Sequence, residues 1–165
     1  MNMTRSILLF VFSFALLSCS KDDTPAPPQS ELRIEIDGQT VVFTDVYVLI
    51  RERGGLPAYR EISASKLSGG TVSQAFTFLF SGTPATADIP DSITYEAASY
   101  WENGFEDNWA SFFGDSLELS FTNSTKGKVS GSFGSFNLLN LDDSTTKVLS
   151  GGSFSNLDIR RISLD

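Results

Sequence analysis

Hydrophobic and polar residues alternate along much of the chain beyond residue 30, and this alternation predicts β-strands. The clearest case is Glu31 to Asp37, where every second residue is apolar and the residues between are charged. Such a period of two places the apolar side chains on one face of a half-buried strand. Asp37-Gly38 then predicts a tight hairpin turn. The residues expected on the buried face are Leu32, Ile34 and Ile36.

Longer apolar stretches predict strands with more of their surface buried. Thr40 to Arg51 is apolar at nearly every position and rich in β-branched residues, which predicts one central strand covered on both faces. Within Val72 to Ser81, Phe76, Phe78 and Phe80 recur at every second position and predict a stripe in the core. Further strands are expected at Ala58 to Ser65, Ile93 to Ala97, Leu117 to Thr122, Lys128 to Leu139, Thr145 to Leu149 and Ser153 to Ile162.

These elements amount to about eight or nine short strands separated by clusters of Gly, Asn, Asp and Ser, and no long helical period competes with them. Strands joined by short turns bury their apolar faces by closing as a sandwich or a barrel. The sequence therefore predicts an all-β fold, an antiparallel β-sandwich with a flattened barrel as the alternative. Residues 31–165 are expected to form one domain.

The last third contains a local echo, because Ser130-Gly131-Ser132-Phe133 recurs as Gly151-Gly152-Ser153-Phe154-Ser155. Phe133 and Phe136 are three positions apart, so they share a face only across an irregularity in the strand. Gly134 is the natural site for such a bulge.

The first 30 residues differ from the rest. Arg5 precedes an apolar run from Ile7 to Leu17, which is typical of a secretory signal and is shorter than the roughly 20 residues of a membrane-spanning helix. Leu16-Leu17-Ser18-Cys19 resembles the lipobox of bacterial lipoproteins. The resemblance implies that residues 1–18 are removed and that the Cys19 thiol receives a diacylglycerol.

Ser20-Lys21-Asp22-Asp23 resembles the acidic signal with which Bacteroidota send lipoproteins to the cell surface. The proline-rich stretch Thr24 to Ser30 follows and predicts an extended spacer, so residues 19–30 form a lipidated linker. We therefore expect an outer-membrane lipoprotein whose domain faces the outside of the cell, with a periplasmic orientation as the alternative.

The amino-acid composition limits the kinds of site and partner that the chain is expected to have. Cys19 is the only cysteine, so no internal disulfide forms, and the chain has no histidine, the usual general base and the commonest zinc ligand. Acidic residues number 20 against 12 basic ones, without a basic cluster, so nucleic acid is not an expected partner. We expect no cofactor and no metal ion.

The chain resembles a family of uncharacterised Bacteroidota lipoproteins in its last third. The resemblance rests on the strand at Leu117 to Thr122, on Lys128 to Phe133 and on the closing stretch from Gly152 to Leu157. Ser132 replaces a threonine and Gly151 an asparagine of the family pattern. This resemblance implies an all-β envelope protein, and it provides no catalytic residues.

The segment from Tyr100 to Phe113 holds both tryptophans of the chain. Trp101, Phe105, Trp109 and Phe112 recur at the spacing of one helical face, although Asn103-Gly104 would interrupt a helix. One interpretation is a short helix or loop that plugs an open end of the sandwich. The other is a binding site for a glycan or an envelope protein, and its candidate residues are Tyr100, Trp101, Phe105 and Trp109.

Acidic residues offer an enzymatic alternative, because Glu102, Glu106 and Asp107 lie among these aromatic residues and paired carboxylates hydrolyse glycosidic bonds. Neither a phosphate-binding nor a nucleophile motif is present. Asp142 and Asp143 lack the spaced-acid loop of a calcium site, so a solvated turn is expected there. A non-catalytic binding module is the favoured prediction, and a small hydrolase is the alternative.

Three Asp-Ser-x triplets resemble the O-glycosylation acceptor of Bacteroidota, although Asp-Ser is also a common turn pair. The candidate acceptors are Ser92, Ser116 and Ser144.

The lipobox leads to a direct test. Cys19→Ser is expected to abolish membrane attachment, because the thiol is the only acceptor for the lipid that the motif implies. Membrane fractionation after a salt wash measures this, with the unchanged protein as the control. A variant that still sediments with membranes contradicts the lipoprotein interpretation.

Overall fold

The computed structural model describes residues 28–112, 118–122 and 127–165. Within these residues the chain is almost entirely β-structure, apart from turns and one short 3-10 helix, η1 (Asn103–Phe105). The strands are β1 (Glu31–Ile36), β2 (Gln39–Phe43), β3 (Asp45–Arg53), β4 (Leu56–Ser68), β5 (Thr71–Thr83), β6 (Ser92–Glu102), β7 (Asp107–Phe112), β8 (Leu119–Thr122), β9 (Lys128–Phe133), β10 (Phe136–Leu139) and β11 (Thr146–Ser163).

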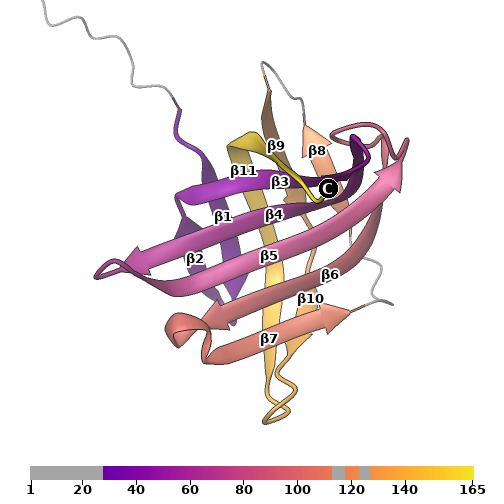
Figure 1. Cartoon of the computed structure of the whole chain (residues 1–165). Coiled ribbons are helices and arrows are strands. Elements are labelled where there is room, and N and C mark those ends of the chain that lie inside the picture. The colour runs from indigo at the N-terminus through magenta and orange to yellow at the C-terminus, as the bar shows by residue number, and fades with distance from the viewer. Residues whose placement is uncertain (1–27, 113–117, 123–126) are drawn as a thin grey trace, which may run out of the picture.

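The strands form two facing layers. In Figure 1, β3 to β7 run across the view as one layer, and β1, β2, β9 and β11 run behind them in a roughly perpendicular direction. Crossed layers of this kind bury the side chains that point inward from both. The all-β prediction is confirmed, and the arrangement is sandwich-like rather than an even barrel.

Hydrogen-bonded strands join the two layers along both margins. At one margin β11 pairs with β3, and at the other β10 pairs with β7 through Leu139 and Ala110. The β3–β11 pair is parallel, in a register that begins with Asp158 opposite Tyr47. The prediction of a purely antiparallel fold is therefore wrong at this margin, because β11 enters the front layer alongside β3 instead of returning through a hairpin.

The strand count also differs from the expected eight or nine, because the described residues form eleven strands in one sheet. The single strand expected over Thr40 to Arg51 is two strands, β2 and β3, separated at Thr44. β2 forms a hairpin with β1 in the back layer, whereas β3 pairs with β4 in the front layer. An apolar run does not reveal such a change of layer, since both strands contribute to the same core.

Near the C-terminus the sequence predicts too many strands rather than too few. The two strands expected near Thr145 to Leu149 and Ser153 to Ile162 are one strand, β11, of 18 residues. Its pairing register shifts opposite Glu35/Ile36 and again between Phe154 and Leu157, where Asn156 has φ 56°. These irregularities bend β11, so its first part pairs with β10 and β1 and its last part with β3.

The core lies between the layers and is rich in aromatic rings. Phe76, Phe78 and Phe80 are fully buried, which confirms the stripe predicted on β5. The Phe78 ring contacts Tyr95 at 5.3 Å and Phe133 at 5.5 Å between ring centroids. These contacts join β5 and β6 of the front layer to β9 of the back layer.

The echoed Gly-Ser-Phe segments are partners in the back layer. Gly152 lies opposite Phe133 and Gly131 lies opposite Phe154 in the β9–β11 ladder. A Cβ atom on Gly152 would lie 2.3 Å from the Phe133 ring, and one on Gly131 would lie 2.1 Å from the Ser120 carbonyl oxygen of β8 and 2.5 Å from the Phe154 ring. Each ring therefore occupies the space that a side chain would need on the opposing strand. This explains why both segments contain a glycine and a phenylalanine.

Phe133 and Phe136 both lie in the core, with their ring centroids 6.1 Å apart. The expected irregularity lies between them, but as a break between β9 and β10 at residues 134–135 rather than as a bulge within one strand.

A buried arginine holds the loop between β5 and β6. Arg60 is 1% exposed, and its guanidinium donates hydrogen bonds to the carbonyl oxygens of Ala85 at 2.6 Å, Asp88 at 2.8 Å and Ala87 at 3.0 Å. Desolvation lowers the pKa of Arg60 below its ordinary value. The loop is thereby fixed against β4.

The described ranges contain no helix with the length and hydropathy that a membrane-spanning helix requires.

Truncation of the central ring tests the core. Phe78→Ala is expected to lower the free energy of unfolding by about 3 to 5 kcal/mol, because it removes a fully buried ring. Chemical denaturation measures the change. Leu141→Ala is the control, since Leu141 is 70% exposed and its loss should change stability by no more than about 0.5 kcal/mol. A loss below about 1 kcal/mol for Phe78→Ala would contradict the packing described.

Candidate functional site

The aromatic segment around Tyr100 to Phe112 is a β-hairpin, in which β6 and β7 are joined by η1. The helical spacing noted in the sequence is therefore misleading, and the segment is not a helical plug. Tyr100 and Trp109 pair across the hairpin and point inward, where they are 0% and 8% exposed. Trp101, one residue further along β6, points to the opposite face, as strand geometry requires.

The turn of this hairpin is built from three consecutive left-handed residues, Asn103 (φ 52°), Gly104 (φ 72°) and Phe105 (φ 75°). Only glycine adopts this conformation without cost, and asparagine tolerates it better than most residues. The Asn103 side-chain amide donates to the Asp107 carboxylate at 2.5 Å across the turn. This geometry directs Phe105 away from the core, and its side chain is 54% exposed.

Phe105 and Trp101 form an aromatic pair on the outer face of the front layer. Their ring centroids are 5.9 Å apart and their planes meet at 70°, an edge-to-face contact. Such a contact stabilises an exposed ring by about 0.5 to 1.5 kcal/mol and limits its motion. Of the four predicted binding residues, the structure therefore places Phe105 at the surface, leaves Trp101 partly exposed on the outer face, and buries Tyr100 and Trp109 in the interior.

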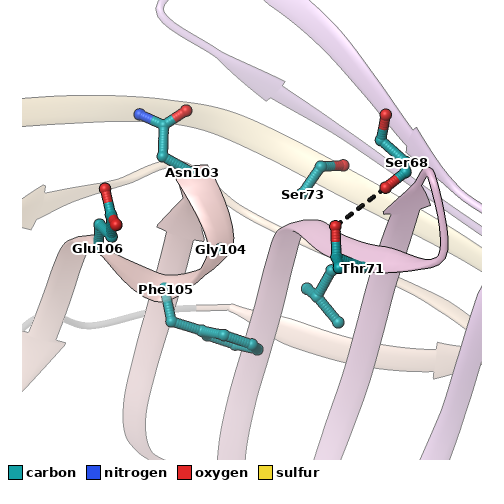
Figure 2. A pocket seen from close by; sticks show the side chains of 8 residues that line it. Ser68, Thr71, Ser73, Asn103, Gly104, Phe105 and Glu106 are labelled. Carbon is teal, nitrogen blue, oxygen red and sulfur yellow. Dashed lines mark hydrogen bonds between the residues drawn. The ribbon is translucent and has the colours of Figure 1, made fainter.

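An open pocket of about 640 Å³ lies between this turn and the β4–β5 turn. Gly69 and Gly70 make the β4–β5 turn, and Thr71 Oγ1 donates to the Ser68 carbonyl at 3.0 Å. Figure 2 shows the Phe105 ring on one side of the turn backbone, with Asn103 and Glu106 on the other. The pocket is lined by Ser68, Thr71, Val72, Ser73, Asn103, Gly104, Phe105 and Glu106.

The lining combines one aromatic ring with hydroxyl, amide and carboxylate groups, and Glu106 is its only charged residue. A ring packs against apolar C–H surface, whereas hydroxyl and amide groups form directional hydrogen bonds. The pocket is therefore suited to a ligand that has both an apolar face and many hydroxyl groups.

The inner side of the same hairpin carries a polar cluster centred on Lys147. Its ammonium lies 3.2 Å from the Glu102 carboxylate and 3.9 Å from that of Asp37, and it sits 4.3 Å from the centroid of the Trp109 ring. Tyr100 donates its hydroxyl proton to Glu102 at 2.8 Å and accepts a hydrogen bond from Gln74, also at 2.8 Å. Burial and the neighbouring Glu102 carboxylate raise the pKa of Tyr100 above its ordinary value.

The acidic residues of the predicted hydrolase are thus divided between two environments. Glu102 faces inward and pairs with Lys147, whereas Glu106 is exposed at the turn and Asp107 accepts a hydrogen bond from Asn103. Among the described residues no three acidic side chains gather as a metal site would require. At the β10–β11 turn, Asp143 accepts hydrogen bonds from the Thr145 hydroxyl and amide, which lower the pKa of its carboxyl.

Two of the candidate glycosylation residues, Ser92 and Ser144, are exposed. Ser116 lies outside the described residues, as do the signal segment and Cys19.

Sequence reasoning missed the β4–β5 side of the pocket and the Lys147 cluster. Ser68 and Phe105 are distant in sequence, and only the pairing of β5 with β6 brings their turns together. No local pattern carries this information. The inward direction of Tyr100 was readable in principle, because it follows once Asn103-Gly104 is taken as a hairpin turn.

Comparisons with protein-family models, with curated proteins and with solved structures gave no match to this chain.

The division of the two tryptophans is measurable by fluorescence. Acrylamide is expected to quench Trp101 more strongly than Trp109, because Trp101 is partly exposed on the outer face whereas Trp109 is 8% exposed. The Trp101→Phe variant should lose the quenched component, whereas the Trp109→Phe variant should retain it. Protection of both indoles in the folded protein would show that the outer aromatic pair is covered.

Proposed function

We propose that this protein is a non-catalytic, glycan-binding module of a lipoprotein at the bacterial cell surface. The observation that carries the proposal is the Phe105 ring, which is 54% exposed beside an open pocket and is held by Trp101. An apolar ring kept at the surface by a strained turn has no role in the core. Such rings commonly dominate the energy of binding interfaces.

A sugar ring matches this pocket chemically. Its C–H face packs on an aromatic ring such as Phe105. Hydroxyl groups exchange hydrogen bonds with side chains of the kind found at Ser73, Asn103 and Glu106, and since Asn103 and Glu106 lie on the other side of the turn from the ring, they would meet a different part of the glycan. The single carboxylate and the absence of a basic residue from the lining favour an uncharged or amino sugar over an acidic one.

The hydrolase alternative has no comparable support. Glu102 points away from the pocket and forms an ion pair with Lys147, while Glu106 lies exposed at the pocket itself. A glycosidase needs two facing carboxyl groups across the scissile bond.

The location is proposed from the N-terminal sequence. The lipobox at Leu16 to Cys19 would provide a lipid anchor, and the acidic residues after it favour export to the surface. The proline-rich linker would lift the domain away from the membrane, where extracellular glycans are accessible.

Titration of the full-length protein in detergent micelles with neutral oligosaccharides of glucose, mannose and N-acetylglucosamine tests the proposal. Calorimetry and Trp101 fluorescence are the readouts. Phe105→Ala is expected to weaken binding about tenfold, which corresponds to about 1.4 kcal/mol. Leu141→Ala is the matched control, because Leu141 is also an exposed apolar residue but lies at the β10–β11 turn.

The proposal fails if no oligosaccharide in the series binds, or if Phe105→Ala and Leu141→Ala bind equally well. If both variants unfold at the same temperature as the unchanged protein, the comparison is made between folded proteins.

A further inference from the structure

A second hollow lies on the outer face of the front layer, away from the hairpin turn. It has a volume of about 480 Å³ and crosses the middle strands of the layer. We call it the outer groove, and its residues are Arg51, Tyr59, Glu61, Thr77, Leu79, Ala97 and Ser99.

The floor of the outer groove is made by short side chains on paired strands. Ser99 of β6 lies opposite Thr77 of β5, and Ala97 lies opposite Leu79 in the same ladder. Leu79 in turn lies opposite Glu61 of β4. Since neighbouring strands are about 4.8 Å apart, the floor extends about 10 Å across the layer from β6 to β4.

An aromatic ring and an arginine border the far end of the outer groove. The Arg51 guanidinium lies 5.8 Å from the centroid of the Tyr59 ring, and its Nη2 atom lies 3.5 Å from the Glu61 carboxylate. Because the two charges compensate one another, this end carries no net charge. The buried Nε atom of Arg51 has no hydrogen-bond partner in the described part of the chain, so the guanidinium has not used all its donors.

The outer aromatic pair lies next to the outer groove along β6. Ser99 and Trp101 are both on β6 and both point outward, so Trp101 stands about 7 Å beyond the near end of the groove. Trp101 contacts Phe105, which lines the first pocket. Exposed or partly exposed rings thus stand at both ends of one surface path, with small side chains between them.

We propose that this path binds an internal stretch of a linear, uncharged polysaccharide, with one part of the chain at Phe105 and Trp101 and another at Tyr59. The inference rests on the proposed glycan-binding function and adds that several consecutive sugar units are recognised together. A terminal sugar would occupy only the pocket at Phe105. The flat, shallow floor accommodates a chain that enters and leaves without ending.

The affinity for oligosaccharides of increasing length tests this inference. The probes are the di-, tetra- and hexasaccharide of whichever neutral series binds, titrated into the full-length protein in detergent. Affinity is expected to rise with length until both ends of the path are occupied. Tyr59→Ala should weaken hexasaccharide binding at least fivefold and leave disaccharide binding unchanged, whereas Phe105→Ala should weaken both.

Ser99→Arg provides a second variant, which fills the outer groove with a long side chain while Tyr59 and Phe105 remain in place. It should reduce hexasaccharide binding to the level of the disaccharide. Thermal unfolding identifies a variant that has lost its fold, and the other variant then carries the test.

Four outcomes overturn the inference. The first is an affinity that does not rise beyond the disaccharide, and the second is hexasaccharide binding that neither variant changes. Either result excludes the outer groove from the binding site. The proposed function still stands in both cases if Phe105→Ala weakens binding. An equal loss for both lengths in Tyr59→Ala assigns that residue to the fold. If no sugar of any length binds, the proposed function fails together with the inference.

Discussion

The reciprocal packing of two phenylalanine rings against two glycines is the constraint on which the back layer depends. The Phe133 ring covers Gly152 and the Phe154 ring covers Gly131, so at these two positions β9 and β11 fit together because one residue of each pair lacks a side chain. Phe133 then reaches the rings of Phe76 and Phe78 in the front layer. Because no disulfide joins the layers among the described residues, their contact between the hydrogen-bonded margins comes from the packing of side chains.

The sequence predicted the elements of this fold better than their partners. The alternation at Glu31 to Ile36 and the phenylalanine stripe on β5 depend only on the period of a strand, and both are confirmed. The division at Thr44 and the parallel pairing of β3 with β11 depend on which strands meet in space, and no local pattern specifies that. For the same reason β9 and β10 were expected as one strand, although both follow a single edge of β11.

At the candidate site the sequence identified the right hairpin but not its two faces. Tyr100 and Trp101 are neighbours, and strand geometry sends one to the core and the other to the surface. The charged residues of the inner face form ion pairs with one another, since Lys147 pairs with both Glu102 and Asp37. The outer face keeps Phe105 exposed, so one short hairpin both closes the core and presents a ring to solvent.

The position of β11 in the chain has a consequence for folding. Its partners β1 and β3 are near the start of the domain, and Ser30 donates a hydrogen bond to the Asn156 carbonyl, 126 positions later. Contacts so distant in sequence require a large loss of chain entropy before they form, and chains dominated by them fold slowly. Because β11 is synthesised after every strand that it joins, neither layer is complete until that strand has emerged. Strands β3 to β7 pair in successive hairpins as they are made, whereas the back layer can close over them only after the last strand of the chain has been synthesised.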